Sequence, residues 1–288
     1  MKNLPKLILL DYDKNKDLKI FVRFLNNQYH KQHRNMILRA FPELKELLEK
    51  EKNDEFAVRK LIENVYVKYS SEIKRIIEES KKLIKTNSEG AFRALGIAME
   101  YQWGKDAVYT AIPTLLPFCP FENNKFYFSV LWQIKKGPNK DLLMIAIHEI
   151  SHFIFFDYLK KVKNGEKILT NHNLKYFLQE SLTTALFNTK PLKRFFKTEN
   201  QLGNPEIREL YVQAKNNKPE KIADYIKEKY IKSKENKQTF ENFITAIVAE
   251  FINKPTDFEE KRILWNKNGV SIFSEPTLLK EYQKPIRI

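Results

Sequence analysis

His148, Glu149 and His152 form an H-E-x-x-H pattern in this chain of 288 residues. On a helix, positions four residues apart lie one turn apart on one face, so both imidazoles can reach one ion. Zinc accepts neutral imidazole nitrogens, and a catalytic zinc site keeps a fourth position for water after three protein ligands. A carboxylate beside them can take a proton from that water and pass it to a leaving amine. The pattern therefore predicts a zinc-dependent peptidase with Glu149 as general base.

The residues around the pattern are apolar on nearly every side. Both 142–147 and 153–156 consist almost entirely of hydrophobic residues, which is typical of a buried helix. Two imidazoles and a carboxylate in such surroundings are costly without partners, and a metal ion supplies one to all three.

Two residues on the next predicted helix are candidates for the third ligand. Glu180 lies in an apolar stretch followed by small residues, where a carboxylate needs a partner and the helix can approach its neighbour closely. His172 lies between Asn171 and Asn173 at the expected helix start, where a capping or exposed role is natural. Glu180 is favoured, so the predicted metal ligands are His148, His152 and Glu180.

With these residues the sequence resembles the zincin superfamily, and the downstream glutamate is similar to that of its gluzincin branch, which includes thermolysin and related aminopeptidases. The resemblance covers about residues 106–187 and implies a peptide or protein substrate that pairs with a strand beside the cleft, for which 125–134 is suitably placed. Thermolysin-like enzymes carry an Asp one turn after the ligand glutamate, where this chain has Thr184, so the groups that orient the ligands must differ. Endopeptidase and exopeptidase activity both stay open.

Two other interpretations compete with this one. With His172 as third ligand the chain resembles SprT-like proteases, which act on DNA-bound proteins, although a single cysteine cannot build a zinc ribbon. The second interpretation is a catalytically silent zincin scaffold that binds partners through its lysines. The intact Glu149 argues against it, because a scaffold needs no general base. Iron, manganese or cobalt could also replace zinc at such ligands.

The sequence also contains candidates for an oxyanion donor and for a second metal site. Four residues are chemically able to stabilise an oxyanion, and sequence selects none of them: Tyr158, His172, Tyr176 and Tyr211. Asp11, Asp13, Asn15 and Asp17 match the first ligand positions of a calcium loop. Lys16 and Val22 replace its glycine and its closing glutamate, so calcium is disfavoured.

The amino-acid composition indicates the broad class of protein to which the chain belongs. A hydrophobic content of 42% is typical of a folded chain, and 51 basic against 36 acidic residues give a net charge of +15. This charge favours acidic partners, nucleic acid among them, but no motif indicates one, and the lysines fit solvated helix faces. The single Cys119 excludes an intramolecular disulfide. No export signal or membrane span is expected, which favours a cytoplasmic protein; oligomeric state is not predicted.

The elements that position these residues are predicted as an α+β fold, predominantly helical, with a zincin-like core and a small sheet beside the active-site helix. We expect a hairpin from strands at 7–10 and 18–25, and helices over 26–103 with a break at 87–90. Prolines in 106–121 favour an extended segment and exclude a central strand. A strand at 125–134, a turn at 137–139, and helices at 140–162 and 171–187 follow. The predicted regions are 1–105 (N-terminal hairpin and helices), 106–190 (metallopeptidase core) and 191–288 (C-terminal helices).

Overall fold

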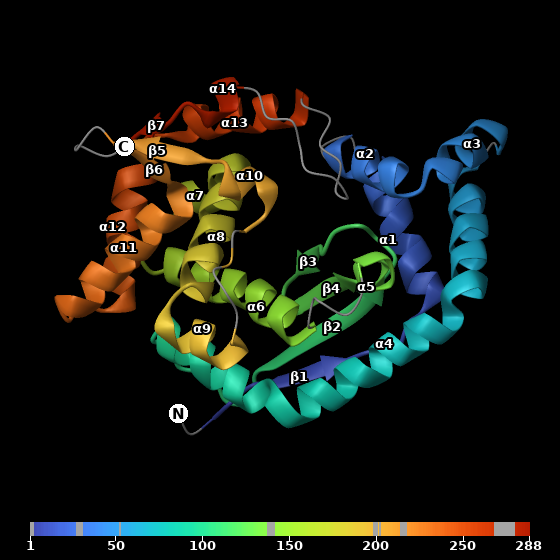
Figure 1. Cartoon of the computed structure of the whole chain (residues 1–288), viewed down its shortest axis with the longest axis horizontal. Coiled ribbons are helices and arrows are strands. Elements are labelled where there is room, and N and C mark those ends of the chain that lie inside the picture. Colours follow the sequence, from blue (N-terminus) through green and yellow to red (C-terminus); the bar gives the residue numbers. More distant parts are fainter. Residues whose placement is uncertain are drawn as a thin grey trace.

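Helices dominate the computed structural model, which describes residues 3–26, 31–51, 53–136, 142–197, 201, 203–213, 218–267 and 280–288 (Figure 1). Two small sheets accompany them. The prediction of a mainly helical α+β fold with small sheets is therefore confirmed.

The N-terminal segment is a strand followed by a helix, so the predicted hairpin is wrong. Strand β1 (Lys6–Leu9) leads into helix α1 (Lys14–Asn26), and the amides of Asn15 and Lys16 donate to the Asp13 side chain at the helix start. The apolar residues from Leu18 to Leu25 fit a helical period as well as an alternating one, and the Asp13 contacts favour the helix.

Helices α2 (Lys31–Ala40), α3 (Pro42–Lys50) and α4 (Asp54–Ala98) follow, and α4 curves along the sheet toward α9 (Figure 1). The break predicted at 87–90 is wrong, because α4 continues through it and is non-helical only at Tyr69. Gly90 instead allows α4 to pack closely against α9, because a Cβ at this position would lie 2.6 Å from the ring of Phe195.

The larger sheet has the strand order β1-β2-β4-β3, with β2 (Val108–Thr114) parallel to both neighbours and β3 (Phe121–Glu122) antiparallel to β4 (Lys125–Ser129). The prediction that prolines keep 106–121 out of a central strand is wrong. The Thr110 amide points to the β4 side, so the nitrogen of Pro113 points to the β1 side. Pairing with β1 ends at Ala111, so the proline removes no ladder bond there.

The strand predicted at 125–134 ends early, at Ser129, where α5 (Val130–Lys136) begins. The turn predicted at 137–139 and the start of the next helix at 140 lie outside the described residues. Helix α6 (Leu142–Leu159) then crosses the core. It is the one described helix long and apolar enough to span a membrane, and 67% of it is buried inside the structure.

Helices α7 (Gly165–Thr170), α8 (His172–Phe187), α9 (Lys190–Phe196) and α10 (Pro205–Arg208) follow α6. The second sheet, β6-β5-β7, contains β5 (Tyr211–Gln213), β6 (Pro219–Lys221) and β7 (Ile286–Arg287). The remaining helices are α11 (Ile222–Glu235), α12 (Phe240–Phe251), α13 (Pro255–Lys267) and α14 (Lys280–Gln283).

The end of α4 joins the C-terminal helices to the core. Tyr230 of α11 donates to the Ala98 carbonyl over 2.8 Å, and the Glu100 carboxylate accepts from the Phe240 amide at the start of α12, also over 2.8 Å. Buried side chains from all three predicted regions form one apolar cluster. The domain boundaries themselves stay a prediction.

Candidate metal centre

Helix α6 carries the H-E-x-x-H residues in its buried middle. It contains no glycine or proline, and apolar side chains surround the polar ones, so the helix is held by packing on nearly every side. The rings of His148 and His152 lie one turn apart with centroids separated by 4.6 Å. The two side chains differ in exposure: 30% of the His148 side chain is open to solvent against 1% for His152.

Helix α8 brings the third predicted ligand to the same point. The Asn171 side chain caps its start by accepting from the Leu174 amide, and small buried residues let α8 pack on α6. One carboxylate oxygen of Glu180 lies 3.2 Å from His148 Nε2 and the other lies 3.2 Å from His152 Nε2. The three side chains form a group that could hold a metal ion, with ligand atoms within 4.8 Å of one another.

The spacing of these atoms fits a bound ion. Nitrogen and oxygen ligands of tetrahedral zinc lie at about 2.0–2.2 Å from the metal, which places neighbouring ligand atoms about 3.3–3.6 Å apart. The observed contacts of 3.2 Å are close to that edge length. The buried His152 Nε2 also lacks a hydrogen-bond partner among the described residues, although Glu180 lies beside it. A metal ion would give this atom the partner that the chain does not provide.

A chain of hydroxyls fixes which nitrogen of His152 carries hydrogen. Ser151 lies 2.7 Å from the His148 carbonyl, which can only accept, so the Ser151 hydroxyl donates there. Thr183 Oγ1, 2.6 Å from Ser151 Oγ, must then donate to Ser151. His152 Nδ1, 3.2 Å from Thr183 Oγ1, is therefore the donor of the last contact. The neutral ring keeps its lone pair on Nε2, which is the atom that faces Glu180.

Burial favours the neutral form of this imidazole, and the adjacent imidazoles favour the charged form of the Glu180 carboxylate. Burial lowers the pKa of His152, against the opposing influence of Glu180. Burial alone would raise the pKa of Glu180, but the two adjacent imidazoles hold it well below its usual range. A neutral imidazole and an ionised carboxylate are the forms that bind a metal.

A loop after α9 supports Glu180 from the other side. The Asn204 side chain donates to one carboxylate oxygen over 3.2 Å. Asn188 at the end of α8 holds this loop by donating to the Gln201 carbonyl and accepting from its amide, each over 2.7 Å. Gly203 permits the close approach, because it has φ of +76° and a Cβ there would lie 2.6 Å from Thr184 Oγ1.

Glu149 is buried beside the ligands. The residue is 6% exposed, and burial raises the pKa of its carboxyl to about 8, with His148 opposing and Glu180 adding to the shift. Within the described ranges its carboxylate accepts no hydrogen bond. A buried carboxylate of this kind is available to a water molecule rather than to the protein.

The other residues predicted for chemistry lie elsewhere. His172 begins α8 and is outside the ligand group, eight residues and about 12 Å along the axis from Glu180. Tyr158 donates to the Met99 carbonyl, and Tyr176 donates to Glu206. Tyr211 lies in β5, paired with Lys221.

The acidic residues near the N-terminus do not form a calcium loop. Asp17 is buried, with its carboxylate accepting from Tyr12, from Thr114 and from the Leu115 amide. Asp11 instead pairs with Lys81 on α4. These carboxylates therefore tie α1 and α4 to their surroundings.

Sequence reasoning missed the residues that orient the ligands. Thr184 was identified as a departure from the thermolysin pattern, but its hydroxyl donates to the Glu180 backbone carbonyl. The residue that contacts an imidazole is its neighbour Thr183, with Ser151 behind it. Small hydroxyl residues on two facing buried helices were the available signal. Asn204 gave no signal, because it follows Glu180 by 24 residues in a loop.

The strand beside the site is β3 rather than the predicted 125–134 segment. β4 is paired on both sides, so the sheet ends at β3. Phe121 of β3 packs against His152, with ring centroids 5.8 Å apart. Comparison with protein-family models, with curated proteins and with solved structures finds no significant match.

Proposed function

We propose that this chain is a zinc-dependent metallopeptidase with a zincin-like core. The observation that carries the proposal is the grouping of three ligand residues between two buried helices: one Glu180 oxygen lies 3.2 Å from His148 Nε2 and the other lies 3.2 Å from His152 Nε2. Two imidazoles and one carboxylate are a ligand set found in catalytic zinc sites. The partial exposure of His148 leaves one side from which a substrate can approach.

A bound zinc ion would supply polarisation of a peptide carbonyl and a lowered pKa for a water molecule. His148, His152 and Glu180 would hold the ion, and the Thr183–Ser151 relay keeps His152 in the tautomer that this requires. Glu149 takes a proton from the attacking water and delivers it to the leaving amine. Its burial, and the absence of hydrogen bonds to its carboxylate from the described residues, support this role.

Metal content tests the ligand set. Protein purified without chelators or added metal is measured by mass spectrometry for zinc, iron, manganese and cobalt, as wild type and as His148→Ala, Glu180→Ala and His172→Ala. We expect about one zinc per chain in wild type and His172→Ala, and loss in the other two variants. A wild type that neither contains nor takes up metal would overturn the proposal.

Hydrolysis tests the role of Glu149. Glu149→Gln preserves size and leaves the three ligands in place, so zinc content is expected to match wild type while cleavage of an unfolded protein substrate falls about 100-fold or more. Unchanged cleavage in this variant would contradict its assignment as general base. His172→Ala serves as the matched control and keeps its activity.

A further inference from the structure

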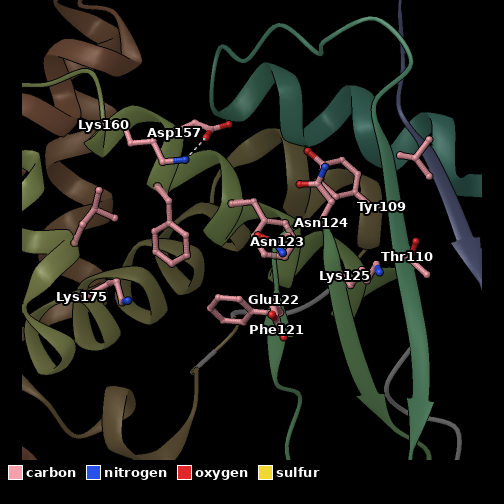
Figure 2. A pocket seen from close by; sticks show the side chains of 14 residues that line it. Tyr109, Thr110, Phe121, Glu122, Asn123, Asn124, Lys125, Asp157, Lys160 and Lys175 are labelled. Carbon is pink, nitrogen blue, oxygen red and sulfur yellow. Dashed lines mark hydrogen bonds and ion pairs between the residues drawn. The ribbon is translucent and has the colours of Figure 1, made fainter. Parts of the chain in front are cut away.

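A cavity of about 700 Å³ lies beside the candidate metal centre. Its walls come from the start of β2, the β3–β4 turn, the second half of α6, the end of α7 and the first turn of α8 (Figure 2). This volume is in the range of cavities that enclose small ligands or substrate side chains.

Aromatic rings line one part of the cavity. Tyr109 and Phe153 stack with centroids 6.0 Å apart, and Phe121 packs edge-on against Phe153 at 5.5 Å. Phe156 lies 6.0 Å from Phe121. These rings offer a surface for an aromatic or large aliphatic side chain.

The acidic residues of the cavity already have cationic partners. Asp157 lies 3.2 Å from the Lys160 ammonium and accepts from the Tyr101 hydroxyl over 2.9 Å. Glu122 accepts from Arg23 over 3.1 Å. Neither carboxylate is therefore left to balance another lysine.

Lys175 has no such partner among the residues that the structure describes. Figure 2 shows its side chain extending from α8 toward the space in front of Phe121. It is half-buried, and in the part of the chain that the structure describes its ammonium has no carboxylate within 4.0 Å; it lies over the Phe156 ring, 5.7 Å from the centroid. Burial lowers the pKa of Lys175. Exposed Lys125 adds a second positive charge to the rim.

The cavity adjoins the metal centre through Phe121. This ring contacts His152 on one side and Phe153 and Phe156 on the other. The cavity and the candidate metal centre therefore share the Phe121 ring, and this shared contact is the reason for assigning the cavity to a residue next to the scissile bond.

We propose that this cavity is a substrate subsite that receives an aromatic or large aliphatic side chain together with an adjoining carboxylate, which pairs with Lys175. The assignment of the ligand as substrate rests on the proposed peptidase function. The carboxylate belongs either to an acidic side chain or to a peptide C-terminus, since both present the same charge and geometry to an ammonium group.

The test is direct binding of four short peptides to the full-length Glu149→Gln chain, with and without added zinc, by calorimetry. The first is a blocked hexapeptide containing Phe-Glu, the second replaces its Glu with Gln, and the third replaces its Phe with Ala. The fourth is Ala-Ala-Ala-Phe with a free C-terminal carboxylate. The same series is measured on Lys175→Met, which keeps the length of the side chain, and on Lys167→Met, an exposed lysine of α7 outside the cavity lining.

We expect the Phe-Glu peptide or the free-carboxylate peptide to bind at least tenfold more tightly than the Gln peptide. That advantage should disappear in Lys175→Met and persist in Lys167→Met. The stronger of the two binders identifies the source of the carboxylate, and weaker binding of the Ala peptide reports the aromatic surface. Equal binding of all four peptides, no binding at all, or equal effects of the two lysine substitutions would overturn the proposal.

The two proposals fail separately in this experiment. Zinc uptake without carboxylate-dependent peptide binding removes the subsite and leaves the metal centre. Carboxylate-dependent binding to a chain that takes up no zinc removes the peptidase and leaves a peptide-binding cavity.

Discussion

At the scale of single residues, the Thr183 hydroxyl determines how His152 presents its lone pair. Thr183→Val keeps the shape of the side chain but removes the acceptor for the Nδ1 hydrogen. We expect zinc affinity to fall about 10- to 100-fold, as is usual when a group that orients a metal ligand is lost. Competition with a chelator of known affinity measures this change.

The matched control is Thr184→Val, one position along the same buried helix. Its hydroxyl donates to the Glu180 backbone carbonyl and contacts neither imidazole. Zinc affinity in this variant should stay close to that of wild type. Equal losses in the two variants would mean that the hydroxyls act on helix stability rather than on His152.

The predicted ligands could be found from the sequence where their role depends on local spacing along the chain. His148 and His152 are one turn apart in the chain itself, and Glu180 was recognisable as a carboxylate in an apolar helix. The hydroxyl relay was not predictable, because it needs the rotation of α8 against α6, which places Thr183 rather than Thr184 toward His152. That rotation is set by packing between helices and leaves no signature in either helix alone.

At the scale of elements, the 201–204 loop is held against α8 by a glycine. Gly203→Ala would strain a backbone with φ of +76° and bring a methyl group against Thr184. We expect the free energy of unfolding to fall by about 1–3 kcal/mol, the usual cost of a residue in a disfavoured backbone region. Zinc affinity should fall as well, because Asn204 moves with the loop. Chemical denaturation and chelator competition measure the two effects.

Gly104→Ala is the control for this substitution. Nothing lies within 4 Å of a Cβ at Gly104, and its φ is not in the left-handed region. Alanine there should leave zinc affinity unchanged and stabilise the fold slightly by restricting the unfolded chain. A Gly203→Ala protein as stable as this control would show that the loop adapts without strain.

Predictability differs among the elements for a physical reason. α6 and α8 were predicted closely because each is a long apolar stretch between residues that favour turns. The 18–25 segment was assigned to a strand because its apolar residues fit both periods, and its capping by Asp13 was overlooked. The central position of β2 was excluded on account of Pro113, whose tolerance depends on where the neighbouring strand β1 ends.

At the scale of the whole molecule, buried Asp17 links α1 to the end of β2 across 97 residues. Burial raises the pKa of Asp17 from 3.8 to about 6, although hydrogen bonds from Thr114, Leu115 and Tyr12 oppose the shift. Below both values the folded and unfolded states hold the proton equally. Between about pH 4 and 6 only the folded state keeps it, so the free energy of unfolding falls as pH rises through this window.

The expected loss is about 3 kcal/mol, from a difference of roughly two pKa units. Asp17→Asn does not titrate and should flatten the stability profile between pH 4 and 6, as measured by denaturant unfolding at a series of pH values. Asp106→Asn is a control at an exposed position whose φ of 59° asparagine tolerates. A profile for Asp17→Asn that parallels wild type would contradict the burial argument.

The unequal exposure of the three candidate ligands has a consequence for exchange kinetics. His152 and Glu180 lie behind the surface, whereas 30% of the His148 side chain faces solvent. On the proposed ligand set, an ion arriving from solution would meet His148 first and a departing ion would release it last. We therefore expect substitutions that restrict the motion of this ring to change the rates of metal loading and release more than they change the affinity.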